Sequence, residues 1–188
     1  MECITPATLG ELDAWLTVHA GTSPSVWLRL AKAGSGRPVL PKGELVKTLL
    51  AHGWIDSLPA KLDAAYYKLR ISPRDPRSNW SALNKRYVAE LEIEGRLTDR
   101  GRAMVELAKD TGTWDALNDV DALVVQDDLA AAFAKTPGSR AQWDAFPRSV
   151  KRGQLEQVYT AKRPATRAKR IAQVVGLAAV GRRAFFER

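Results

Sequence analysis

The spacing of apolar residues along the first quarter of the chain predicts two helices and one strand. Leu12, Trp15 and Leu16 recur at helical spacing, and the segment "VWLRLAK" that follows them has the composition of a strand. After a turn at "GSGRP", a second helix is predicted to begin near Pro41. It should end at Gly53, because glycine is the usual residue just beyond the last turn of a helix.

Two further strands, "WIDSL" and "AYYKLRIS", are predicted to form a hairpin around "KLDA". In the second strand apolar and polar residues alternate, so its two faces should differ. One face carries Ala65, Tyr67, Leu69 and Ile71, and the other carries Tyr66, Lys68, Arg70 and Ser72. We expect the first face to lie in a core and the second to be polar.

Beyond the hairpin the pattern becomes helical. Pro73 and Pro76 exclude regular structure from "PRDPRSN", which is therefore predicted to be a rigid basic loop. The next two helices should begin after the hydroxyl caps Ser81 and Thr98 and end before glycines. The segment "TGTWDALNDVDALVVQ" lacks clear periodicity and is interpreted as a connector.

The remainder of the chain is predicted to be a small helical bundle. Its helices are "DDLAAAFAK", "SRAQWDAF", "SVKRGQLEQVYTA" and "PATRAKRIAQVVGLAAV". The fold class is therefore α+β, with a small N-terminal α/β part of about three strands with helices, followed by a C-terminal all-α bundle. The boundaries are predicted at 1–115 for the first domain, 116–125 for the connector and 126–188 for the bundle.

The composition limits the classes of protein to which this chain can belong. The 188 residues are 45% hydrophobic, which is ample for a packed core, and no apolar run is long enough to span a membrane. The N-terminus lacks the pattern of an export signal, so we expect a soluble cytoplasmic protein. With one cysteine, Cys3, and two histidines, the usual zinc spacings are absent, and we predict neither a metal nor a cofactor.

The net charge of +8 is concentrated at the C-terminal end. Residues 148–188 contain eleven Lys or Arg and two Glu, whereas residues 1–147 contain eighteen basic and nineteen acidic residues. Such asymmetry indicates an anionic partner, or else a solvated helical surface that keeps the chain soluble.

Three arginines of the last predicted helix, Arg163, Arg167 and Arg170, run beside its apolar face. Cations near the start of a helix oppose its dipole, so these arginines need a negative partner. Glu156 or an acid of the connector could supply it internally. The alternative is contact with an anionic ligand or a partner.

Residues 53–101 contain motifs that carry a family resemblance: "GWIDS", "YYKLRISPR", "SNWSALNK" and "EGRLTDRG". These motifs resemble the bacteriocin-protection, YdeI or OmpD-associated (OmdA-type) family, and the resemblance extends over nearly the whole chain. Ser57, Ile71 and Ser72 depart from the usual family pattern. Losing the glycine after Asp56 could alter how closely a ligand or a neighbouring backbone approaches.

The resemblance implies an N-terminal α/β part joined to a C-terminal helical part. It also implies a link to tolerance of antimicrobial peptides or envelope stress, and it transfers no catalytic residue. The family name mentions a porin of the outer membrane, whereas the N-terminus of this chain shows no export signal.

The hairpin, the loop and the capped helix are predicted to bring one set of side chains to a common surface. This candidate site contains Trp54, Asp56, Arg70, Arg74, Ser78, Trp80 and Asn84. Arginines suit a carboxylate or phosphate, so we expect the site to bind a small anionic ligand or a partner protein. In the competing interpretation, both tryptophans lie in the core, Ser81 only caps a helix, and the arginines cover the indoles with their stems.

Two other classes of function are weaker. An enzyme could use Asp56 with nearby arginines, but an Asp and an Arg across a hairpin are more often a structural ion pair, and no nucleophile motif is present. His52 is interpreted as a helix-terminal residue favoured by the dipole. A nucleic-acid module is third, because the basic C-terminal helices match no established motif.

Overall fold

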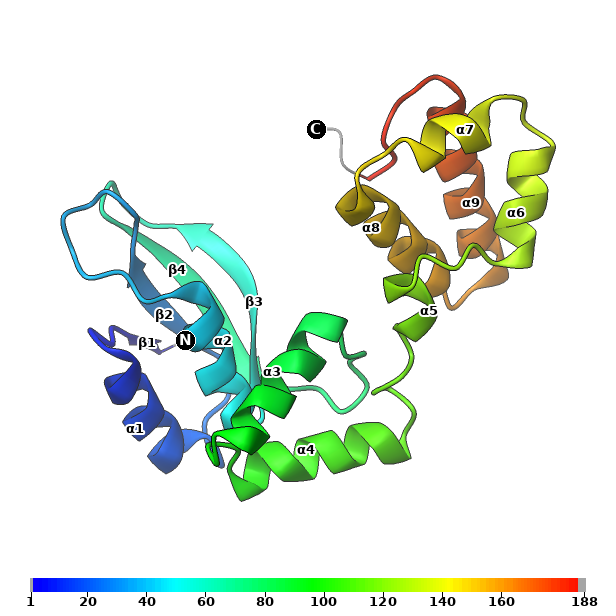
Figure 1. Cartoon of the computed structure of the whole chain (residues 1–188). Coiled ribbons are helices and arrows are strands. Elements are labelled where there is room, and N and C mark those ends of the chain that lie inside the picture. Colours follow the sequence, from blue (N-terminus) through cyan, green and yellow to red (C-terminus); the bar gives the residue numbers. More distant parts are fainter. Residues whose placement is uncertain (1, 186–188) are drawn as a thin grey trace. The chain divides into compact units, whose positions relative to one another are not determined.

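The three segments predicted as strands and one short N-terminal strand form one four-stranded sheet in the computed structural model, which describes residues 2–185 (Figure 1). The strands are β1 (Cys3–Ile4), β2 (Val26–Ala31), β3 (Trp54–Lys61) and β4 (Tyr66–Pro73), in the order β1-β2-β4-β3. β2 is parallel to β1 and antiparallel to β4, which is also antiparallel to β3. The predicted hairpin is confirmed, and β1, two residues long, is too short to show an alternating pattern.

One face of the sheet is covered by α1 (Leu9–His19) and α2 (Lys42–Ala51). Leucines of both helices pack against the buried alternate residues of β2 and β4 and against Trp54. These core residues include Leu12, Leu16, Leu45, Leu49, Val26, Leu28, Leu69 and Ile71. By the same alternation, the opposite face carries Trp27, Arg29, Tyr66, Lys68 and Arg70. We call this second surface the outer sheet face.

A second core lies between α2, α3 (Ala82–Ile93) and α4 (Asp99–Asp110), and it contains Trp80. Both helices begin at the predicted caps. The Ser81 hydroxyl accepts a hydrogen bond from the N–H of Asn84 at 3.3 Å, and the Thr98 hydroxyl accepts one from Gly101 at 3.3 Å. Since α2 contributes to both cores, it holds the sheet and the following helices together.

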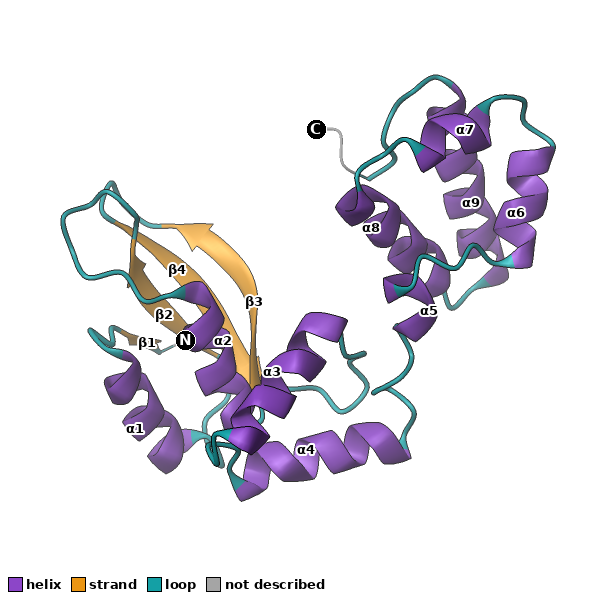
Figure 2. Cartoon of the chain, in the orientation of Figure 1, coloured by secondary structure: helices purple, strands orange, loops and turns teal. Residues whose placement is uncertain are grey.

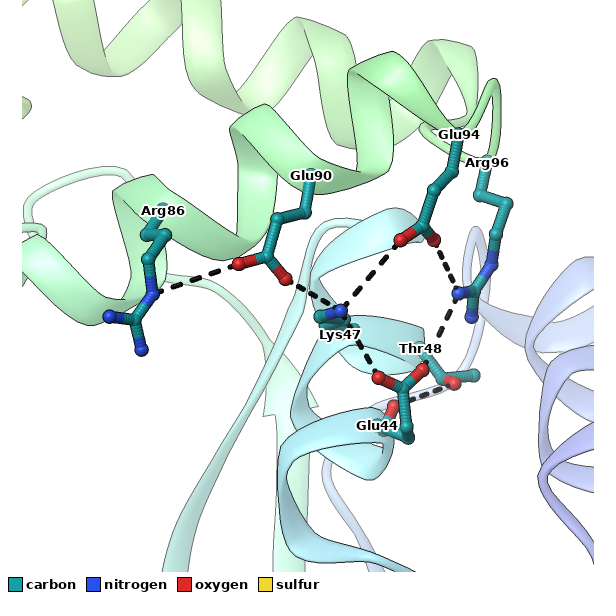
Figure 3. Close-up of polar contacts among 7 residues, drawn as sticks. All are labelled: Glu44, Lys47, Thr48, Arg86, Glu90, Glu94 and Arg96. Carbon is teal, nitrogen blue, oxygen red and sulfur yellow. Dashed lines mark hydrogen bonds and ion pairs between the residues drawn. The ribbon is translucent and has the colours of Figure 1, made fainter.

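Charged side chains reinforce the contact between α2 and α3 (Figure 3). Lys47 Nζ lies 2.6 Å from a carboxylate oxygen of Glu90 and 3.1 Å from one of Glu44. Hydrogen bonds from these two glutamates raise the pKa of Lys47 to about 12. Arg96 extends the network by contacting Glu94 at 2.7 Å and Glu44 at 3.4 Å.

The chain divides into two compact units, Met1–Ala116 and Leu117–Arg188, and the second is helical (Figure 2). It contains α5 (Asn118–Asp121), α6 (Asp127–Ala134), α7 (Ser139–Asp144), α8 (Arg148–Tyr159) and α9 (Pro164–Ala179). The α+β class with a C-terminal helical part is therefore confirmed. Within residues 2–185, no helix has the length and apolarity needed to cross a membrane.

The core of the second unit explains two features of its sequence. Ile171, Val174 and Val175, the predicted apolar face of the last helix, are all buried in it. Val120 of α5 is buried there as well, although α5 lies in the segment interpreted as a connector. A single four-residue helix is too short for periodicity to reveal.

Candidate ligand-binding sites

The two tryptophans of the predicted site lie in different cores. Trp54, the first residue of β3, is fully buried in the core between the sheet and its covering helices, and its indole N–H donates a hydrogen bond to the carbonyl oxygen of Ala20 at 3.2 Å. Trp80 is buried in the second core, with the ring of Trp114 at a centroid distance of 5.0 Å. Neither ring therefore has a free face toward solvent.

Arg74 contacts Trp80 in the interior of the first unit, whereas the sequence predicted that both side chains line a common surface. Its guanidinium carbon lies 3.9 Å from the centroid of the Trp80 ring, and only 5% of the residue is exposed. The same guanidinium donates hydrogen bonds to the carbonyl oxygens of Asn79 at 2.6 Å and Ser78 at 3.4 Å. Desolvation lowers the pKa of Arg74 to about 10. Arg74 thus stabilises its own loop.

The other predicted residues of the first unit are separated by the sheet. Arg70 lies on the outer sheet face and donates a hydrogen bond to the Ser25 hydroxyl at 3.1 Å. Asp56 pairs in register with Ile71, so it lies on the helix-covered face. Asn84 is half-buried in the first turn of α3. The structure brings together Arg74, Trp80 and the backbone of Ser78, and places Asp56 and Arg70 on opposite faces.

Among the arginines of α9, Arg167 has an internal carboxylate partner. Its Nε and Nη2 atoms lie 2.7 and 2.8 Å from the two carboxylate oxygens of Asp128, at the start of α6. This contact lowers the pKa of Asp128. Glu156 instead pairs within α8. Arg170 donates to a backbone carbonyl of α8, and Arg163 is exposed.

A histidine and an aspartate meet at a hollow that the sequence did not indicate. His52 Nε2 lies 2.9 Å from Asp13 Oδ1, beside a hollow of about 360 Å³ bordered by α1 and α2. The nearby hydroxyls of Thr17, Thr48 and Thr98 each donate to a backbone carbonyl. Because those protons are already used, none of the three hydroxyls is aligned as a nucleophile toward His52.

Two arginines and a tyrosine border a hollow at the end of the outer sheet face. The guanidinium carbon of Arg29 lies 3.8 Å from the centroid of the Tyr66 ring, and that of Arg37 lies 5.2 Å from the same centroid. With Thr5, Pro6, Ala7, Ala31 and Pro38, these side chains line a volume of about 220 Å³. We call this cavity the arginine hollow.

Among the described residues, no carboxylate pairs directly with the two arginines of the hollow or with Lys68, which lies opposite Arg29 in the sheet. Within residues 2–185, no Asp or Glu oxygen lies within 4.0 Å of a side-chain nitrogen of Arg29, Arg37 or Lys68. The Nε atom of Arg29 is buried and has no hydrogen-bond partner there. Asp63 is close enough for Arg29 to contribute to its lowered pKa, but backbone N–H groups of the hairpin turn, chiefly that of Tyr66, are the main cause.

Sequence reasoning could have found part of the arginine hollow. The alternation of β4 placed Tyr66 on the polar face, and the same period in β2 places Arg29 there too. Arg37, in the turn "GSGRP", carried no such signal, because a loop has no periodicity that fixes the direction of its side chains.

Two different family models match the two parts of the chain. Residues 4–104, more than half of the chain, match the family described as Domain of unknown function (DUF8412), and this range contains the motifs "GWIDS" and "SNWSALNK". Residues 122–181 match OmdA, described as Bacteriocin-protection, YdeI or OmpD-Associated. Neither the curated proteins nor the solved structures gave a match. The chain therefore belongs to the DUF8412 family, and its residues 122–181 match the bacteriocin-protection, YdeI or OmpD-associated family that its sequence resembles, whereas the motifs at residues 53–101 lie in the DUF8412 match.

Proposed function

We propose that this chain serves in bacteriocin protection by binding a small organic anion in the arginine hollow. The single observation that carries the proposal is that Arg29 and Arg37 both lie next to the Tyr66 ring beside a cavity while neither has a carboxylate partner within residues 2–185. The description of the OmdA region supports the link to bacteriocin protection.

The guanidinium of Arg29 is the first physical argument for a ligand, because it lines the hollow and makes neither a hydrogen bond nor an ion pair within residues 2–185. An anion in the hollow would accept hydrogen bonds from this guanidinium. Because a guanidinium presents its N–H groups as a planar fork, a carboxylate or phosphate can accept two hydrogen bonds from it at once.

The charge around the hollow is the second argument. Lys68 lies beside Arg29 on the outer sheet face, in register across the β2–β4 pair, and Arg70 is two residues further along β4. Four cations near one surface repel each other, and a bound anion relieves that repulsion. The volume of about 220 Å³ equals about seven water molecules in the liquid, which suits a ligand of the size of benzoate or a small phosphate ester.

Thermal unfolding with defined anions tests the proposal. We would measure the melting temperature with inorganic phosphate, benzoate or AMP, each against sodium chloride at the same ionic strength. We expect at least one anion to raise the melting temperature of the wild type beyond the salt control. The rise should be lost in Arg29→Gln and Arg37→Gln and kept in Arg102→Gln, a change at an exposed arginine of α4.

Two results would contradict this function. One is that sodium chloride at equal ionic strength raises the melting temperature of the wild type as much as each of the three anions does. The other is a response that survives both Arg29→Gln and Arg37→Gln. Bacterial cells that express the Arg29→Gln, Arg37→Gln double variant at the wild-type level should also survive bacteriocin less well than cells that express the wild type.

A further inference from the structure

Another cavity lies on the helix-covered side of the sheet, between the first turn of α2 and strands β3 and β4. Its volume is about 180 Å³, and Leu40, Leu45 and Leu69 form apolar walls. Asp56 and Lys42 bring one negative and one positive charge to the same cavity. We call it the Asp56 cavity. It is distinct from the arginine hollow, since Asp56 and Arg29 belong to opposite faces of the sheet.

The carboxylate of Asp56 has no internal partner. The side chain is partly buried, yet within residues 2–185 it makes neither a hydrogen bond nor an ion pair. The ladder between β3 and β4 shifts register between Asp56 and Pro59, so one extra residue of β3 bulges there. Bulges often redirect a side chain beside a binding site. A carboxylate that lines a cavity and has no protein partner can pair with a ligand that brings a positive charge.

Lys42 makes the same cavity suitable for a negative group as well. Lys42 is the first residue of α2, and Pro41 before it provides no side-chain cap for the helix. The start of a helix favours negative charge, and the lysine adds to that preference. The leucine walls favour an apolar side chain on such a ligand.

We infer that the Asp56 cavity binds a small zwitterion, an α-amino acid with an apolar side chain. The ammonium group contacts the Asp56 carboxylate, the carboxylate lies near Lys42, and the side chain lies between the leucines. Tyr67 borders the same cavity, and burial together with the charge of Asp56 raises the pKa of its phenol. The phenol therefore stays protonated at neutral pH and can donate a hydrogen bond to the ligand.

Three probes that share one carbon skeleton separate the contribution of the ammonium group to binding from that of the carboxylate group. L-leucine carries both charges, isoamylamine is the same molecule without the carboxylate, and 4-methylpentanoate is the same molecule without the ammonium. Isothermal titration calorimetry on the whole chain should show L-leucine binding most tightly and 4-methylpentanoate least tightly. Asp56→Asn should weaken L-leucine and isoamylamine at least about tenfold, because it removes a charge-assisted contact while keeping the shape of the side chain.

Two further variants make the result specific. Lys42→Gln should weaken L-leucine and leave isoamylamine unchanged, which keeps the test decisive should Asp56→Asn fail to fold. Asp110→Asn, at the exposed end of α4, should change neither affinity. The inference is wrong if the wild type binds neither L-leucine nor isoamylamine at about 10 mM, if 4-methylpentanoate binds as tightly as L-leucine, or if Asp56→Asn leaves both affinities intact. These outcomes leave the arginine hollow unaffected, because its probes and variants are different.

Discussion

Replacing Arg74 distinguishes a structural arginine from a ligand-binding one. In the structure its guanidinium stacks on Trp80 and donates to the carbonyls of Ser78 and Asn79, while 5% of the residue is exposed. We therefore expect Arg74→Ala to destabilise the first unit and to leave anion binding intact. Arg74→Met is the informative companion, because methionine keeps an apolar stem against the indole and carries no charge.

The expected magnitudes follow from these contacts. A desolvated cation on an indole contributes about 2 kcal/mol, hydrogen bonds from a charged donor about 2 kcal/mol, and the buried stem about 2 kcal/mol. Against these, the fall in the pKa of Arg74 from its usual value to about 10 corresponds to roughly 3 kcal/mol of lost solvation of the charged form. Arg74→Ala should therefore cost about 3 kcal/mol. Arg74→Met, which keeps the stem and removes the solvation loss, should cost about 1 kcal/mol.

Urea unfolding at pH 7, followed by tryptophan fluorescence, measures both changes. Arg77→Ala is the matched control in the same loop, since the Arg77 side chain is 86% exposed and pairs with Asp75 two residues away, and its midpoint should equal that of the wild type. The reasoning would be refuted if Arg74→Ala unfolded at the wild-type midpoint, or if Arg74→Met were the less stable of the two variants.

The remaining predictions concern the helices. Arg167→Gln should lower the stability of the second unit by about 1–2 kcal/mol at pH 7, whereas Arg163→Gln should not. Arg167 lowers the pKa of Asp128, so the stability that this ion pair contributes is present above pH 3.8 and is lost as the pH falls through the folded-state pKa of Asp128. If the difference in urea midpoint between the wild type and Arg167→Gln were the same at pH 2 as at pH 7, this expectation would be contradicted. Gly101→Ala should cost about 3 kcal/mol or more, since the new Cβ would lie 2.3 Å from a backbone oxygen of α2. Gly10→Ala should be neutral or slightly stabilising, because the nearest atom to its new Cβ is 3.8 Å away. Equal melting temperatures for the two variants would show that the backbones of α2 and α4 can separate at no cost.

The spacing of apolar and polar residues predicted those parts of the fold that depend only on residues close together in the sequence. Alternation in β4 separated Leu69 from Arg70, and the hydroxyl and glycine signals placed the starts of α3 and α4 at Ser81 and Thr98. These features need only neighbouring residues. The same period also assigns Arg29 and Tyr66 to one face, once the register of β2 and β4 is known.

The parts that could not be predicted depend on contacts between distant segments. Whether Arg74 points outward or onto Trp80 depends on the packing of the second core, and the meeting of His52 with Asp13 joins residues 39 positions apart. The place of Arg167 near the start of a helix indicated that it needs a negative partner, but only the packing of α6 against α9 supplies Asp128. Pairings of this kind carry no local sequence signal.

The central claim, an anion held by Arg29 and Arg37 against Tyr66, is tested most directly by the NMR signals of the arginine Nε–H groups. A ¹H–¹⁵N spectrum, assigned with Arg29→Gln and Arg37→Gln, would be followed while inorganic phosphate, benzoate or AMP is added at constant ionic strength. We predict that the signals of Arg29 and Arg37 shift together and saturate with at least one of these anions, while that of Arg102 stays in place. Signals of all three arginines that stay in place, or that move in parallel without saturating, would contradict the site.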